Sequence, residues 1–259
     1  MILVDTHTHL YSDPLAADPA AVAARAAARG VTRLVVPAYD EASWADLPAL
    51  ARLPGVFAAY GIHPWVADRS DPLDIRDRLD TALRSAVHRP VAIGEIGLDA
   101  KLGPEGPPLE VQRAILRPQL ELAVDLGLPV ILHARGGFDE LLQDIDRFGG
   151  RLRGVVHAFS RGPDLARRFT QAGLALGLGG AVTRPAARVR RTAAVLPLDH
   201  FVLETDAPSI GLDGVPAEQT EPAHVADIAA ALAGLRGESI DTIAEVTTAH
   251  ACRIFRLDP

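Results

Sequence analysis

Two histidines separated by one residue stand close to the start of the chain, where a short apolar run ends in Asp5, His7 and His9. If residues 2–8 form a strand, alternate side chains share a face, so these three polar groups point the same way from its C-terminal end. Two imidazoles that converge in a protein interior need hydrogen bonds or a metal ion. On its own, the pair fits a metal site and a satisfied polar pair equally well.

Comparable polar residues follow other short apolar runs further along the chain. Each has a plain structural alternative, because His133 fits a satisfied core histidine, Glu95 a structural carboxylate and Asp206 a helix or loop cap. The complete set at such positions is His7, His9, His63, Glu95, His133, His157 and Asp206. Burial of so many polar groups in one place would be costly without an ion that compensates for it.

The composition of this set favours two metal ions over one. Leaving His63 aside, four imidazoles and two carboxylates exceed the ligands of one tetrahedral catalytic metal with an open position. A two-metal site, with cations about 3.5 to 4 Å apart, uses six ligands when one carboxylate bridges, and Glu95 is the candidate bridge. Imidazole suits Zn, Mn, Fe, Co or Ni, and the carboxylates keep Mg among the candidates.

The elements that must position these residues alternate along the whole chain. Short apolar runs predict eight strands, at residues 2–8, 33–37, 55–60, 90–95, 128–132, 154–156, 174–178 and 201–203. Helices are expected over 19–29, 41–53, 72–88, 109–126, 138–148, 164–172, 186–196, 222–235 and 239–248. This order predicts a TIM (β/α)8 barrel with a C-terminal helical extension, as a single domain over residues 1–259, and it brings the polar strand ends to one mouth.

Composition limits the classes of function. The net charge of −7 argues against a long duplex-binding surface, and the basic runs at 167–168 and 188–191 read as solvated helix faces. Two bound divalent cations would still make the mouth locally positive.

No apolar run approaches the about 18 residues of a membrane span, and the start of the chain has no basic segment, so we expect a cytoplasmic protein. Cys252 is the only cysteine, which excludes a cysteine metal cluster.

Six ordered motifs are similar to the signatures of the TatD family of metal-dependent deoxyribonucleases. They are Asp5-Thr-His-Thr-His9, Gly61-Ile-His-Pro64, Gly94-Glu-Ile-Gly-Leu-Asp99, Leu132-His-Ala-Arg135, His157-Ala-Phe-Ser160 and Leu203-Glu-Thr-Asp-Ala-Pro208. The resemblance covers essentially the whole chain. It implies a barrel of the amidohydrolase type that holds two divalent metals and hydrolyses phosphodiester bonds, commonly by 3′-to-5′ removal of nucleotides from DNA.

The resemblance also implies roles for single residues. His7, His9 and Asp206 would hold one metal, His133 and His157 the other, and Glu95 would lie between them. His63 would line the substrate pocket near the scissile phosphate, with Arg135 as a further contact to the terminal nucleotides. Asp5 and Asp99 would orient ligand rings from behind. Asp206 would take the proton of the attacking water, which makes Glu95 and Asp206 the expected catalytic residues.

Several positions depart from the family pattern without removing a ligand. Gly136-Gly137 replaces a common Asp-Ala pair, Thr220 replaces an Asn, and His250 occupies a typical Asn position. The loop at 209–219 carries two acidic residues and no lysine or arginine, so poor binding of extended duplex is expected. We therefore expect the partner to be a DNA end, most often single-stranded, with no obligate protein partner.

Two rival interpretations stay open. The first is an enzyme of the same superfamily that hydrolyses a small ester, amide or phosphoester. Many such enzymes bridge their metals with a carbamylated lysine, but Glu95 stands at that position and the sole lysine, Lys101, lies beyond it. The second rival is a non-catalytic barrel that binds a partner, which a complete ligand set disfavours.

Overall fold

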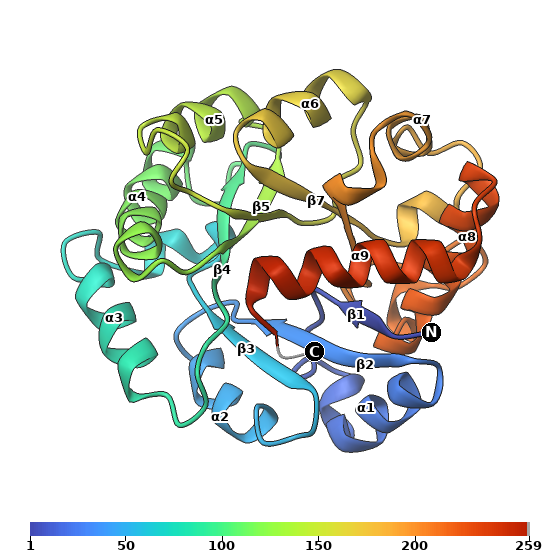
Figure 1. Ribbon diagram of the computed structural model, residues 1–259. Helices are drawn as coiled ribbons and strands as arrows, with labels where there is room; N and C mark the ends of the chain where they lie inside the picture. Colours follow the sequence, from blue (N-terminus) through green and yellow to red (C-terminus); the bar gives the residue numbers. More distant parts are fainter. Residues whose placement is uncertain (258–259) are drawn as a thin grey trace.

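Eight short parallel strands pair in sequence order in the computed structural model, which describes residues 1–257 (Figure 1). The strands are β1 Leu3–Asp5, β2 Val31–Pro37, β3 Val56–Tyr60, β4 Ala92–Asp99, β5 Val130–Arg135, β6 Gly154–Val156, β7 Leu174–Leu178 and β8 Phe201–Leu203. The backbone N–H of Thr6 donates to the carbonyl of Leu203 (3.0 Å), and Thr8 bridges Ala207, so the last strand meets the first. The expected (β/α)8 barrel is confirmed. Residues 258 and 259 of the expected single domain lie outside the described residues.

Helices follow the strands and surround the barrel (Figure 1). They are α1 Pro19–Ala28, α2 Leu47–Leu50, α3 Ile75–Ser85, α4 Leu109–Leu126, α5 Phe138–Asp146, α6 Pro163–Gln171, α7 Val189–Val195, α8 Val225–Arg236 and α9 Ile240–Phe255. One expected helix, over 41–53, is wrong: the segment forms a 3₁₀ turn at Ser43–Ala45 and the single turn of α2. Pro48 explains the break, because proline lacks an N–H and is tolerated only in the first turn of a helix.

The strands that carry site residues differ in length from the expectation. β1 ends at Asp5 instead of residue 8, so His7 and His9 lie on the irregular segment that follows it. β4 and β5 extend further than expected, to Asp99 and Arg135, so that Glu95 and His133 lie within strands. Glu95 lies where the pairing of β4 with β5 is irregular, between Ile93 and Ile96, whereas His133 lies in the regular part of this pairing. The strands thus bring both side chains to one small site.

The C-terminal helix α9 covers one end of the barrel, where it crosses the centre of the view in Figure 1. Ala251 and Phe255 of α9 pack with Val4, Val35 and Val202 in one buried apolar cluster. With this end closed by apolar contacts, the carboxyl ends of the strands form the accessible mouth. None of the helices among the described residues has the length and apolar character needed to cross a lipid bilayer.

Candidate metal centre

Glu95 lies at the centre of the buried polar cluster, and each of its carboxylate oxygens faces a different group of donor atoms. Its Oε2 lies 3.2 Å from Nε2 of His7 and 3.8 Å from Nε2 of His9. Oδ1 of Asp206 completes this group, at 3.2 Å from Nε2 of His9 and 3.6 Å from Nε2 of His7. We call His7, His9 and Asp206 with Oε2 of Glu95 the first donor set.

The other oxygen of Glu95, Oε1, faces three further imidazoles. It lies 2.7 Å from Nε2 of His157, 2.9 Å from Nδ1 of His133 and 3.2 Å from Nε2 of His63. We call His133 and His157 with Oε1 of Glu95 the second donor set. Every predicted ligand therefore lies in one of two sets that share a single carboxylate, and that carboxylate is the residue expected to bridge.

The donor atoms of both sets fit divalent cations. Nε2 of His7 lies 3.1 Å from Nε2 of His9, and Nδ1 of His133 lies 3.3 Å from Nε2 of His157. A divalent cation between such ring nitrogens would accept the lone pairs of both once the rings have lost their protons. Nδ1 of His7 and Nδ1 of His157 are buried without a hydrogen-bond partner among the described residues. Imidazole and carboxylate ligands together suit transition metals such as zinc and manganese.

Tyr11 fixes the tautomer of His9. The Tyr11 hydroxyl donates to the carbonyl oxygen of Pro37 (2.8 Å), so its oxygen accepts a hydrogen bond from Nδ1 of His9 (2.9 Å). With its proton on Nδ1, the ring presents the lone pair of Nε2 to the first donor set. The sequence reasoning missed Tyr11, because a tyrosine two residues after a histidine carries no recognisable spacing signal.

Asp99 holds His133 as the sequence predicted. Its Oδ2 lies 3.4 Å from Nε2 of His133 and accepts from the Trp65 indole N–H at 2.7 Å. Burial alone would raise the pKa of Asp99, but the hydrogen bonds from His133, Trp65 and the Lys101 backbone lower it to about 2. The resulting carboxylate keeps the proton of His133 on Nε2, which leaves Nδ1 free to face Glu95.

His63 directs its ring N–H toward Glu95, whereas His9 and His133 direct theirs away from Glu95, to Tyr11 and Asp99. The backbone N–H of Trp65 donates to Nδ1 of His63 (3.2 Å), so the neutral ring carries its proton on Nε2. Burial is the main reason why the pKa of His63 is lowered, so this neutral form prevails near pH 7. An Nε2–H group is a hydrogen-bond donor and a poor metal ligand, although it lies beside the second donor set.

Asp5 does not behave as expected. Its Oδ1 accepts from the backbone N–H of His7 (3.2 Å) and of Thr205 (3.0 Å), and its Oδ2 accepts from the Thr205 hydroxyl (2.6 Å). Asp5 therefore ties the end of β1 to the segment after β8 and does not share a face with the two histidines. It positions the backbone of His7, whereas Asp99 positions a ring.

Glu204 is a buried acid that the sequence reasoning passed over, although it follows β8 directly. One of its oxygens accepts from the Ala158 backbone and lies 3.7 Å from Nδ1 of His157. A Cβ on Gly177 would come within 2.1 Å of the same carboxyl group, so only glycine leaves room for it there. Burial is the largest cause that raises the pKa of Glu204, to about 7. Glu204 is the nearest partner for the ring nitrogen of His157 that faces away from Glu95.

The two acids of the donor sets are ionised in spite of their burial. Burial would raise the pKa of Glu95, but the nearby His157, His63 and His7 lower it well below its ordinary value. Burial likewise opposes ionisation of Asp206, but the hydrogen bond from His9 and the nearby charges of His7, His157 and His9 together lower its pKa. Asp206 also adopts a φ of 53°, in the left-handed region that few non-glycine residues occupy. Such strained backbone is common at functional sites.

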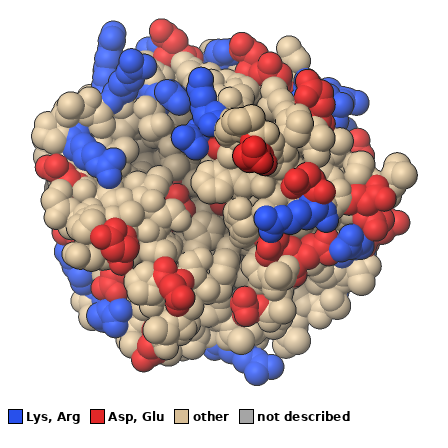
Figure 2. Space-filling view, turned by 180° about the vertical axis from the view of Figure 1, so that it is seen from behind, with Lys and Arg blue, Asp and Glu red and all other residues tan. Residues whose placement is uncertain are grey.

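The mouth offers further groups around this centre. Arg135 lies at the end of β5, with its side chain 54% exposed and its Nη1 3.5 Å from Oδ2 of Asp99. A groove of about 640 Å³ adjoins the site and is lined by Ala158, Ser209 and Arg184 among others. Figure 2 shows the face opposite to α9, hollowed near its centre, with basic side chains gathered beside the upper left of the hollow. The loop at 209–219 has no basic residue of its own, but Arg184 donates to its Gly211 carbonyl (2.6 Å).

Known proteins are similar in sequence to this chain over nearly its whole length. A family model described as TatD related DNase matches residues 4–256, a range that includes both donor sets. The metal-dependent hydrolase YjjV of Escherichia coli strain K12 is 37% identical over 256 residues, with 98% of each chain covered. Its crystal structure agrees with a TM-score of 0.92 over 99% of this chain and 98% of that one. A protein of Erwinia billingiae named 3′-5′ ssDNA/RNA exonuclease TatD is 31% identical over 266 residues, with 98% of this chain and 99% of that one covered.

Proposed function

We propose a specific reaction for this chain, which belongs to the family of TatD related DNases and is a metal-dependent hydrolase. The reaction is hydrolysis of the terminal phosphodiester bond of a DNA strand, in the 3′-to-5′ direction. The direction and the substrate are carried over from the exonuclease of Erwinia billingiae. The observation that carries the proposal is that the two oxygens of Glu95 face two separate donor sets.

In this proposal His7, His9 and Asp206 would hold one divalent ion, His133 and His157 would hold another, and Glu95 would contribute a carboxylate oxygen to each group. The pair of ions would supply Lewis acidity toward a phosphoryl oxygen and a lowered pKa of water. The carboxylates of Glu95 and Asp206 are ionised, as such ligands must be. Zn, Mn, Mg, Ni and Co all suit this donor chemistry.

Three residues of the chain have separate roles in the proposed reaction. Asp206 is ionised, and its carboxylate receives the proton of the attacking water. His63 donates from Nε2–H to a nonbridging oxygen of the scissile phosphate, the role for which its tautomer is fixed by Trp65. Arg135 has N–H groups beyond the one that faces Asp99, and these contact the phosphate of the neighbouring nucleotide.

Trp65 supports a preference for single-stranded ends. Trp65 is 42% exposed, and the centroid of its ring lies 5.1 Å from that of His63. The hydrogen bond to Asp99 fixes the orientation of this ring at the mouth. An exposed aromatic ring stacks on an unpaired base, and a base inside a duplex is not accessible to it. We therefore place the terminal base against Trp65.

A substrate comparison tests the proposal. The metal-loaded protein is given single-stranded DNA, blunt duplex DNA, closed circular DNA, RNA and a small phosphodiester, and the products are resolved by length. Stepwise shortening of single-stranded DNA from the 3′ end is expected. The binding constant should fall with salt concentration only as steeply as for about two or three neutralised phosphates. No shortening of any oligonucleotide beside rapid hydrolysis of a small ester would instead establish the small-substrate alternative. Efficient cutting of closed circles would contradict the requirement for an end.

A further inference from the structure

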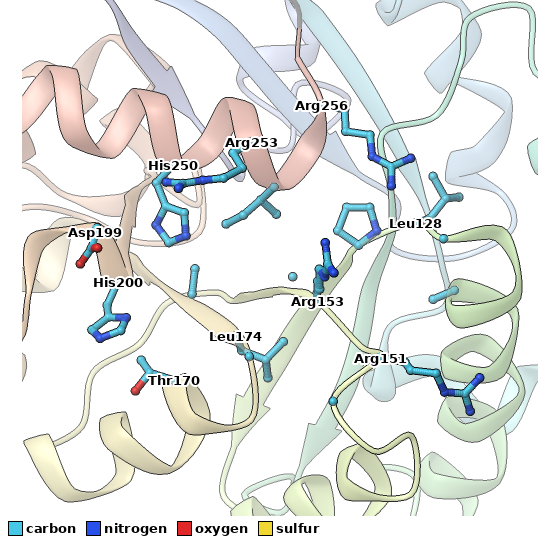
Figure 3. A pocket seen from close by; sticks show the side chains of 18 residues that line it. Leu128, Arg151, Arg153, Thr170, Leu174, Asp199, His200, His250, Arg253 and Arg256 are labelled. Carbon is cyan, nitrogen blue, oxygen red and sulfur yellow. The ribbon is translucent and has the colours of Figure 1, made fainter.

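A second cavity, of about 600 Å³, lies on the face of the barrel that α9 covers (Figure 3). Its walls include residues that precede strands, such as Leu128 before β5, Arg153 before β6 and Asp199 before β8. It therefore opens at the amino ends of the strands, whereas the metal centre lies at their carboxyl ends. Neither donor set contributes a residue to this cavity.

The charge of this cavity contrasts with that of the chain. Four arginines line it, Arg151, Arg153, Arg253 and Arg256, against one carboxylate, Asp199, in a chain with a net charge of −7. None of the four forms an ion pair with a carboxylate of residues 1–257, whereas Arg113, Arg117 and Arg236 do. The four guanidinium groups outnumber the single carboxylate of this lining, so the lining carries an excess of positive charge that attracts an anion.

The arrangement of the arginines suits a compact anion. Figure 3 shows Arg256, at the end of α9, and Arg153, before β6, on facing sides of the cavity. Arg253 and His250 come from the preceding turn of α9. Planar guanidinium groups bind phosphate oxygens through paired N–H donors, so this set fits a phosphate group better than a diffuse negative surface.

The remaining lining fits an organic body attached to that phosphate. Leu128, Leu174 and Ile254 supply apolar wall, and the volume lies within the range of about 300 to 1,000 Å³ that is typical of small-molecule sites. Nδ1 of His250 lies 3.2 Å from the Phe201 carbonyl oxygen, to which only an N–H can donate, so Nε2 is an acceptor. An acceptor beside arginines fits a ligand that combines a phosphate with a hydroxyl or amino donor.

We propose that this cavity binds a small organic phosphate, with the size and chemistry of a nucleoside monophosphate, at a site separate from the metal centre. The phosphate contacts Arg153, Arg253 and Arg256, and the organic part lies on the apolar wall with a donor group toward His250. This inference does not depend on the proposed nuclease reaction, because it concerns residues that the reaction does not use.

Equilibrium dialysis of labelled AMP against the metal-loaded protein tests the inference. The test variant is Arg153→Gln with Arg256→Gln, and the matched control is Arg52→Gln with Arg188→Gln, which removes two exposed arginines that do not line this cavity. AMP bound at the metal centre is counted separately, as the fraction that a single-stranded oligonucleotide with a hydrolysis-resistant phosphorothioate backbone displaces. We expect the test variant to weaken the remaining binding at least tenfold and the control to leave it within twofold. Arg253→Gln alone should give a smaller loss in the same direction, which keeps the test valid if the double variant fails to fold.

The choice of ligands separates the possible sources of the phosphate. We expect AMP to bind more tightly than inorganic phosphate or adenosine, because each of these makes only part of the contacts. Binding of AMP that is fully displaced by the oligonucleotide, or that is unchanged in the test variant, would overturn the inference. Binding of the oligonucleotide, but not of AMP, through Arg153 and Arg256 would also overturn it, in favour of a nucleic-acid contact.

Discussion

Oε1 of Glu95 lies 2.7 Å from Nε2 of His157, while the other oxygen of the same carboxylate belongs to the first donor set. A single side chain thus contacts both donor sets, whose members come from different parts of the barrel. This connection makes Glu95 the residue on which both donor sets depend.

Glu95→Gln is expected to remove one of the two metal ions and to lower the rate at saturating substrate at least about 100-fold. The reason is that a metal ion stabilises the charge of the transition state by several kcal/mol. The amide keeps the shape of the side chain but loses the charge that attracts the cations. Bound metal per chain and activity are measured together. The exposed Glu218 provides a matched control, and Glu218→Gln should change neither quantity. Full metal content in Glu95→Gln would show that this carboxylate is not shared.

Tyr11→Phe is expected to weaken metal binding about 10- to 100-fold, as is usual when an outer partner of a ligating histidine is lost. The hydroxyl that accepts from Nδ1 of His9 disappears, and the ring is no longer held in the required tautomer. Tyr60→Phe removes a phenol outside both donor sets and should leave the affinity unchanged. Equal affinities of the Tyr11 variant and the wild type would mean that the Tyr11 contact does not orient His9.

Metal binding should release protons even at pH 8. Burial would lower the pKa of His157, but the nearby Glu95 and other carboxylates raise it to about 10 in the metal-free chain, so the ring is protonated at pH 8. A metal ion needs the lone pair of Nε2 and displaces that proton, so affinity rises with pH and the acid limb of activity shifts downward with added metal. Calorimetric titrations in buffers of different ionisation enthalpy should report about one released proton per chain or more. Titrations that report no released proton would show that His157 is not a ligand.

Trp65→Leu is expected to raise KM for single-stranded DNA about fivefold or more, since base stacking on an aromatic ring is worth about 1 to 3 kcal/mol. Trp65→Phe keeps an aromatic face but loses the hydrogen bond to Asp99, so it should have the smaller effect on KM. If both variants bind substrate alike, the stacking role is wrong and Trp65 serves only to hold Asp99.

The barrel, and the six residues that the structure brings together around Glu95, could be predicted from the sequence because both follow local rules. Apolar runs mark buried strands, and a polar residue at the carboxyl end of such a run lies at the mouth of a barrel. The residues that it missed act through contacts between distant segments. Glu204 lies beside His157 only because β6 and β8 are held together through β7, and Tyr11 acts through the carbonyl oxygen of Pro37. The direction of the proton on His63 likewise depends on a backbone turn that no residue pattern specifies.

The central claim is that this chain hydrolyses phosphodiester bonds of DNA with two divalent ions held around Glu95. The most direct measurement strips the protein with a chelator, titrates one divalent metal back, and follows bound metal per chain and release of nucleotides from a single-stranded oligonucleotide in the same samples. The account predicts no activity in the stripped protein and full recovery as occupancy approaches two ions per chain, with no recovery in Glu95→Gln. Undiminished cleavage in the stripped protein, or no cleavage of DNA when two ions are bound, would contradict it.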